Sequence, residues 1–346
     1  MRKSLEDSLR ETLRKIFINK NSFGSKLYAD TTQMIFVIKS LDRMIYNFIK
    51  IGISILVIAF VIRGIVNGTL IPYSITYVVD GLKNSEKRSL FLWGLTLFGV
   101  SGLLFAATEL MLMIYFKKLT RGIVVMKHNI IEKILRKRDD REDPEDLVGK
   151  IANDVDFIVW NVNGVLTTLM PNLFTTITAL TTVYSFSHSI GIFISITMLP
   201  YILYAEYYSR KVEVYRTLER KTYSQSIVYI KNLVFGERVN GDLYKTLREW
   251  NNSIDQVLWL DRIYWSLSLG TALISMTGIS LLAEREISEN KLGIATLSGL
   301  LYASLTAHFG MLNAMWALCI QGQTIAALKR VMNHLITVEN INNKRL

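Results

Sequence analysis

Close pairs of acidic side chains are the first features of this sequence that could do chemistry. Asp139 is followed by Asp140, and Asp154 is followed two residues later by Asp156. Two neighbouring carboxyl groups can act as general acid and general base. Both pairs lie in a charged segment with no other catalytic groups around them, so helix caps or solvated helix faces are the favoured interpretation. No catalytic residue is predicted.

Residue type and spacing also argue against a metal site and against ATP hydrolysis. The single cysteine, Cys319, lies in an apolar run, and no segment matches G-x-x-x-x-G-K-[ST], the loop that holds a triphosphate. The chain is therefore not expected to be an enzyme or to bind a cofactor itself. The histidines lack metal-ligand spacing and are interpreted as interfacial or loop residues: His128, His188, His308 and His334.

Three polar residues inside apolar runs are candidates for a transport pathway: Arg63, Glu109 and Asn163. A charge at bilayer depth costs about 2.5–3.5 kcal/mol on insertion scales, so such residues usually face the interior of a helix bundle. Arg63 and Glu109 could pair if their helices are adjacent and antiparallel. A structural ion pair, or a side chain that reaches the membrane interface, is the slightly favoured alternative to a pathway role.

The elements that carry these residues are long apolar blocks. Half of the 346 residues are hydrophobic, and they are gathered into runs of about the 20 residues that a membrane-spanning helix needs. The fold class is therefore predicted to be all-α, a multi-pass membrane helix bundle with six long spans. The blocks are Tyr46 to Tyr73, Ser89 to Phe116, Val162 to Phe186, Ile190 to Tyr208, Tyr264 to Ala283, and Leu292 to Cys319.

The net charge of +11 indicates membrane orientation rather than nucleic-acid binding. Lysine and arginine concentrate in the N-terminal arm and in the second and fourth segments between spans, and such an excess marks the cytoplasmic side. Both termini are thus predicted to be cytoplasmic in the cell membrane. Residues 1–43 are interpreted as an amphipathic interfacial helix or as a soluble helix packed on a neighbour, residues 44–338 as the transmembrane domain, and 339–346 as a short tail.

Two long segments between spans are expected to project into the cytoplasm as helical hairpins. They run from Lys117 to Asn161 and from Tyr208 to Arg262 and are rich in helix-forming residues. At the first corner Asp143 suits an N-cap, Pro144 the first helical position, and Gly149 a helix end. A short helix at this corner could dock on a partner, or it could be a simple solvated turn.

The corner sequence DLVGKIANDVDFI, Asp146 to Ile158, resembles a motif that follows the first intracellular corner of type I ABC exporters. Gly149, Asn153 and Asp154 match in place, although the family's usual basic residue before the Asn-Asp pair is not evident. Other stretches resemble the family in the same order, and the resemblance covers about residues 40 to 338. These stretches are Leu70 to Leu82, Leu292 to Ser304, and Ala326 to Leu335.

The resemblance implies a six-span domain that pairs with a second one, as a homo- or heterodimer, around one transport pathway. It also implies coupling helices that dock on ATP-binding subunits, with Asn153 and Asp154 bracing the first corner. The first coupling helix would contain Asp143, Pro144, Glu145, Asp146, Leu147 and Val148, followed by Gly149. The second would lie either near Leu218 to Ser226, before Lys231 and Glu237, or at Glu237, Arg238 and Gly241 themselves.

The function expected from the resemblance is the membrane-spanning subunit of an ABC-type exporter. After Arg330 the sequence runs only to Leu346, so ATP and Mg²⁺ are expected on a separate ATP-binding cassette subunit, unless the chain is an excised or degenerate domain. The alternative is a non-transporting membrane protein, such as an immunity, sensory or assembly factor, that retains the exporter scaffold. No feature of the sequence identifies a transported substrate.

Overall fold

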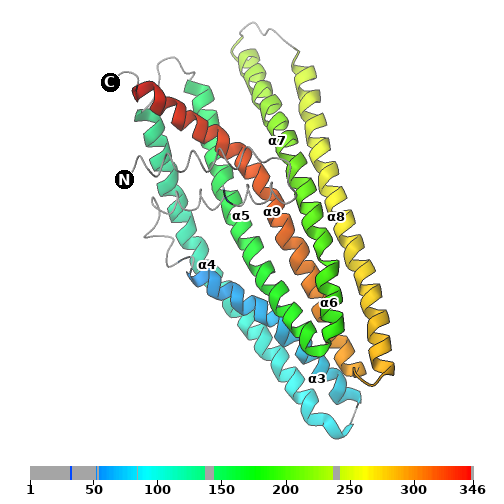
Figure 1. Cartoon of the computed structure of the whole chain (residues 1–346). Coiled ribbons are helices and arrows are strands. Elements are labelled where there is room, and N and C mark those ends of the chain that lie inside the picture. The colour runs from blue at the N-terminus through cyan, green and yellow to red at the C-terminus, as the bar shows by residue number, and fades with distance from the viewer. Residues whose placement is uncertain are drawn as a thin grey trace.

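The structure is a computed structural model that describes residues 54–83, 85–136, 144–236 and 242–343, together with Thr32 and Gly52. The predicted N-terminal amphipathic arm lies outside the described residues. Within them the fold is entirely helical, which confirms the predicted all-α class (Figure 1). The elements are the helix of Ser54–Lys83, which includes the π-helix η1 (Val66–Leu70) and α3 (Ile71–Lys83), then η2 (Ser85–Lys87), α4 (Arg88–Arg136), α5 (Pro144–Phe186), α6 (His188–Thr197), α7 (Leu199–Val234), α8 (Leu243–Ser288) and α9 (Ile294–Asn343).

Five segments of the described chain are long and apolar enough to cross a membrane, as a multi-pass membrane protein requires. They are Ser54–Lys83, Arg88–Lys118, His188–Val234, Leu243–Ser288 and Ile294–Gln321. The predicted third span, Val162 to Phe186, is helical but is not among them. Its apolar run is diluted by threonines and by Pro171 and Asn172, and Thr176, Thr178 and Thr182 donate hydrogen bonds to backbone carbonyls one turn earlier.

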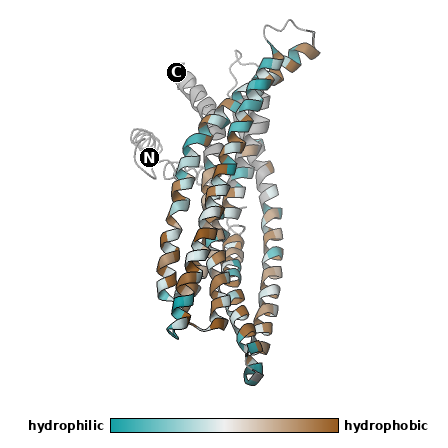
Figure 2. Cartoon of the chain, turned by 90° about the vertical axis from the view of Figure 1, so that its right-hand side faces the viewer, coloured by the Kyte–Doolittle hydropathy of each residue, from teal (hydrophilic) through white to brown (hydrophobic). Residues whose placement is uncertain are grey.

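Several helices are far longer than a bilayer is thick. Helix α4 has 49 residues, α8 has 46 and α9 has 50. At about 1.5 Å per residue each is roughly 70–75 Å long, more than twice the ~30 Å of a hydrocarbon core. Figure 2 shows apolar residues predominating in the lower part of the bundle and more hydrophilic ones along its upper part. The helices therefore continue well past the apolar zone at one end.

The connections between helices alternate between the two ends of the bundle. The α3–α4, α5–α6 and α8–α9 connections lie at the lower end of Figure 1. The last turns of α4, α7 and α9 and the first turns of α5 and α8 lie at the upper end. The three lower connections are short, and in one of them Lys291 and Arg285 hydrogen-bond Glu289 and lower the pKa of its carboxyl group.

The core lies where α5 and α9 pack along each other and where α7 and α8 form a pair beside them. Its largest fully buried side chains include Tyr201, Tyr208 and Tyr264. Close helix contact depends on glycine at Gly68 of η1, because a Cβ there would collide with the backbone of α5 at Thr178 and Ala179. Helix α4 packs on α3, and most of the apolar side chains described between Leu92 and Phe116 of α4 are exposed.

Candidate functional site

The first predicted docking corner lies at the upper end of the bundle, where α4 ends and α5 begins (Figure 1). Pro144 is the first residue of α5, as its fixed φ angle favours. The prediction that Gly149 ends a short helix is wrong, because α5 runs unbroken from Pro144 to Phe186. A glycine inside a long helix costs only about 1 kcal/mol, which the neighbouring helix formers offset. Asp143 lies outside the described residues; Glu145, Asp146, Leu147 and Val148 form the first turns of α5, and Asn153 and Asp154 follow in the same helix.

The second corner lies at the turn between α7 and α8. A corner near Leu218 to Ser226 is excluded, because α7 is helical through that stretch to Val234. The helix ends at Val234, and the chain turns at Gly236, whose φ of 71° favours glycine. Helix α8 begins after the N-cap Asp242, which accepts hydrogen bonds from two backbone N–H groups. Lys231 lies in the last turn of α7. The remaining predicted residues lie outside the described part of the chain: Glu237, Arg238 and Gly241.

Large apolar side chains are exposed at this second corner, which the sequence reasoning missed. Val234, Phe235 and Tyr244 are between 71% and 75% exposed. They lie at the upper ends of α7 and α8, next to the charged stretches of both helices. Exposed apolar clusters rimmed by polar residues mark protein interaction sites. The apolar run Leu233–Phe235, next to a glycine in an otherwise charged segment, could have indicated this exposed cluster.

No protein-family model matches this sequence. No curated protein matches it significantly either.

The predicted contact between Arg63 and Glu109 is present. Arg63, on the Ser54–Lys83 helix, forms an ion pair with Glu109 of α4 and donates a hydrogen bond of 3.1 Å from Nε to Thr108 Oγ1. The guanidinium carbon also lies 4.8 Å from the centre of the Phe105 ring. Arg63 is largely covered, whereas the Glu109 side chain is 57% exposed on the outer side of α4. This geometry holds two antiparallel helices together, and it places the carboxylate outside the core rather than in an enclosed pathway.

Removing the Glu109 charge is expected to destabilise the protein by about 1–2 kcal/mol, because Arg63 loses its counter-charge inside an apolar helix pair. Glu109→Gln tests this in unfolding with increasing sodium dodecyl sulfate in mixed micelles. The exchanged pair, Arg63→Glu with Glu109→Arg, should recover part of the loss. If Glu109→Gln and the exchange are equally destabilising, the ion pair does not contribute to the packing of the two helices.

Asn163 is buried between two helices. Its Oδ1 accepts a hydrogen bond of 2.9 Å from the Tyr115 hydroxyl of α4, and the side chain is 7% exposed. Among the described residues, this bond links α4 to α5. Of the three pathway candidates, Arg63 and Glu109 come together, and Asn163 binds elsewhere.

A buried hydrogen-bond chain across α6 to α9 was not predicted. Tyr201 and His308 Nδ1 share a hydrogen bond of 3.0 Å, and Nε2 of the same ring lies 2.7 Å from Ser275 Oγ. Ser275 in turn lies 2.9 Å from Thr197 Oγ1. The interpretation of His308 as an interfacial or loop residue is wrong, since its side chain is completely buried and both ring nitrogens have partners. The position of a single histidine in one helix does not indicate that it has partners on two others.

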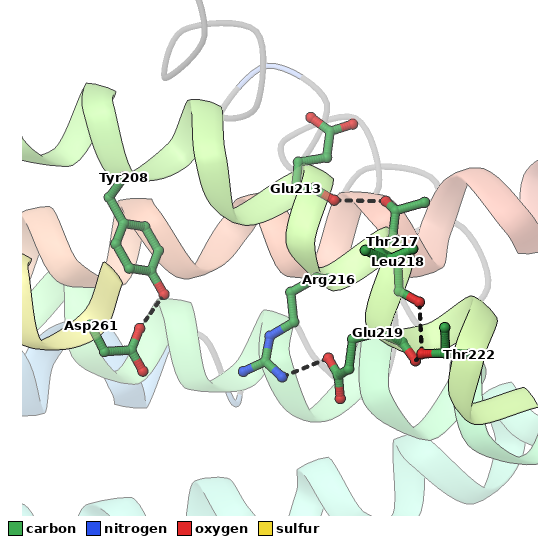
Figure 3. A network of polar contacts seen from close by, with 8 residues as sticks. All are labelled: Tyr208, Glu213, Arg216, Thr217, Leu218, Glu219, Thr222 and Asp261. Atoms are coloured by element: carbon green, nitrogen blue, oxygen red, sulfur yellow. Dashed lines mark hydrogen bonds and ion pairs between the residues drawn. The ribbon is translucent and has the colours of Figure 1, made fainter. Parts of the chain in front are cut away.

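A second polar group lies farther along α7 and α8 toward the upper end. The Tyr208 hydroxyl donates a hydrogen bond of 2.6 Å to Asp261 of α8, as Figure 3 shows. Arg216, two turns farther along α7, binds Glu219 at 2.8 Å. Glu206, which is 3% exposed, pairs with Arg210 at 2.7 Å. These contacts satisfy charges where the apolar zone of the pair gives way to its polar extension. Among the described residues, no three histidine, cysteine or acidic side chains gather as a metal site would require.

Proposed function

We propose that this chain is the membrane-spanning subunit of an ABC-type exporter, driven by ATP hydrolysis on a separate ATP-binding cassette subunit. The observation that carries the proposal is the position of the two corners. The α4–α5 and α7–α8 connections lie at the same end of the bundle, at the tips of helices that extend beyond the apolar zone. A motor subunit placed against this end could contact both corners at once.

The chemistry of the two corners supports docking. The first is acidic, with Glu145 and Asp146 at the start of α5, where the helix dipole favours negative charge. The second presents the exposed apolar residues Val234, Phe235 and Tyr244. An apolar anchor beside a charged contact is the usual composition of a specific protein interface. Glu145, Leu147 and the apolar residues of the second corner are thus the residues assigned to the ATPase contact.

The remaining parts of the proposal follow from the same arrangement. The upper end is cytoplasmic, as the lysine and arginine residues of the segments between spans favour, and α5 completes a six-span bundle. Two such bundles, in a homo- or heterodimer, would enclose the pathway. ATP and Mg²⁺ would be held by the partner, whose closure would draw the corners together. Because α7 and α8 are continuous helices, they would transmit that movement as rigid bodies.

The test is recovery of an ATPase with the tagged chain from native membranes. Glu145→Arg together with Leu147→Asp is expected to reduce the recovered ATPase activity at least tenfold, since reversed charge and a buried polar group at a contact cost more than about 1.4 kcal/mol. Val234→Asp together with Phe235→Asp should have a similar effect through the second corner. Mass spectrometry of the recovered material identifies the partner.

A matched control lies at the opposite end of the bundle. Glu86→Arg together with Leu82→Asp makes the same kinds of change at the α3–α4 connection, where Leu82 is 69% exposed. It should leave the recovered activity unchanged. If the control loses as much recovered ATPase activity as the corner variants, the variants act through folding. If neither pair of corner substitutions changes the recovered activity, the docking assignment is wrong. A native pull-down without any ATPase would favour the non-transporting alternative.

A further inference from the structure

A cavity of about 250 Å³ lies between α7 and α8. Its lining is almost entirely apolar in surface, although four of the residues are tyrosines. It opens to the outside of the helix pair, because Tyr207 is 51% exposed, Leu267 46% and Ile263 37%. The lining residues are Tyr204, Tyr207, Tyr208, Leu260, Ile263, Tyr264 and Leu267.

Three of the four tyrosines that line the cavity have hydroxyl groups hydrogen-bonded to neighbouring groups. The Tyr204 hydroxyl lies 3.0 Å from Thr271 Oγ1, and the Tyr264 hydroxyl donates a 2.8 Å hydrogen bond to the Leu312 carbonyl of α9. The Tyr208 hydroxyl is bound to Asp261. Since these polar atoms already have partners, the rings present carbon to the cavity. Such a preformed apolar wall suits a hydrocarbon chain.

The cavity lies where α7 and α8 change from charged to apolar sequence, the pattern expected at a membrane interface. Toward the upper end, α7 continues into Arg210 and Lys211, and α8 carries Arg262 next to Asp261, which binds Tyr208 of α7. Trp259, one turn from Ile263, is 70% exposed, as interfacial tryptophans are. In the other direction both helices become apolar. A molecule in the cavity would therefore have its tail in the hydrocarbon core and its head at the surface.

The charge at the mouth of the cavity is positive. Lys211 lies four residues after Tyr207, on the same face of α7, and is exposed. Within the described chain it has no carboxylate partner. The nearby acids are occupied elsewhere, since Glu206 pairs with Arg210 and Asp261 accepts from Tyr208. A negatively charged head group at this level would meet an available ammonium group.

From these observations we propose that the α7–α8 cavity binds an anionic phospholipid, with one acyl chain along the tyrosine rings and the head-group phosphate at Lys211. Basic pockets between transmembrane helices, near one face of the bilayer, bind the head groups of anionic lipids in this way. The binding site depends on the chain lying in a membrane and not on the proposed ATPase contact. Loss of the lipid site would therefore leave recovery of an ATPase unaffected.

The head-group contact is tested by native mass spectrometry of the detergent-purified chain titrated with phosphatidylglycerol or phosphatidylcholine. The unaltered chain should prefer phosphatidylglycerol by about fivefold, the contribution of one lysine to an anionic lipid. Lys211→Gln should bring that preference close to one. Lys221→Gln, which removes another exposed lysine of α7, should keep it. If Lys211→Gln also keeps the preference, the head-group assignment is wrong.

The acyl-chain contact is tested by filling the cavity. Ile263→Trp should weaken binding of both lipids severalfold, whereas Leu273→Trp, at a residue of α8 that is 68% exposed and remote from the cavity, should not. Circular dichroism and gel filtration show whether each variant keeps the fold and the oligomeric state. Undiminished lipid binding by Ile263→Trp overturns the proposal. So does a loss of self-association in this variant relative to the unaltered chain, because a second copy of the chain would then occupy this face.

Discussion

Replacing His308 by alanine is expected to lower the free energy of unfolding by about 2–4 kcal/mol, from the cavity left by the ring and the loss of two hydrogen bonds between helices. The ring joins Tyr201 of α7 to Ser275 of α8 from its position on α9. Without it, both hydroxyl groups stay buried and lose a partner. Unfolding in mixed micelles of increasing sodium dodecyl sulfate measures the change.

Two variants separate this hydrogen-bond role from simple loss of volume. His308→Gln keeps a donor and an acceptor and should recover part of the stability that alanine loses. His188→Ala removes an exposed histidine at the start of α6 and should change the free energy of unfolding by less than about 0.5 kcal/mol. Equal values for His308→Ala and His188→Ala would show that the buried chain of hydrogen bonds does not stabilise the bundle.

Gly68→Ala is expected to destabilise the protein by about 3 kcal/mol, the upper part of the range for overpacking. The added methyl group would collide with Thr178 Oγ1 and with the backbone nitrogen of Ala179. Backbone cannot move aside as a flexible side chain can, so η1 and α5 must separate. That separation also lengthens the 2.6 Å hydrogen bond that Thr178 donates to the Gly64 carbonyl.

The control for this substitution has the opposite expected sign. Gly102 lies on the exposed side of α4, and a Cβ added there meets nothing within 4 Å. Gly102→Ala should therefore stabilise the protein by up to about 1 kcal/mol, because alanine loses less conformational freedom in a helix. The same unfolding measurement serves both variants. Destabilisation by both, to a similar extent, would mean that the close approach of η1 and α5 is not what requires glycine.

Features set by composition along the chain were predictable from the sequence. Apolar blocks give helices, and charged residues at bilayer depth seek partners, so the contact of Arg63 with Glu109 could be anticipated from two helices alone. The extension of the helices into charged segments also follows from composition. These features depend on whether lipid or water surrounds each segment, and not on how individual side chains pack. The first apolar block was predicted to end at Tyr73, whereas the helix runs on to Lys83.

Features that depend on several helices at once were not predictable. Gly149 looked like a helix end because a local rule was applied to a residue whose neighbours on both sides favour helix, and α5 continued through it. The sequence allowed two positions for the second corner, and the continuity of α7 to Val234 excludes the earlier one. His308 required knowledge of which helices face it. No periodicity within one segment contains that information.

The continuity of α8 makes it a lever. The helix is fixed within the bundle at Tyr264, whose hydroxyl binds the Leu312 carbonyl, and it runs from there to Leu243 without interruption. That arm is about 30 Å long, so a tilt of about 5° around Tyr264 displaces its tip by roughly 3 Å. Tyr264 also lines the tyrosine cavity, so the cavity lies at the point around which this arm would tilt. If a bound lipid changes the spacing of α7 and α8 at the cavity, the long arm of α8 would convert that small change into a larger displacement at the corner between α7 and α8.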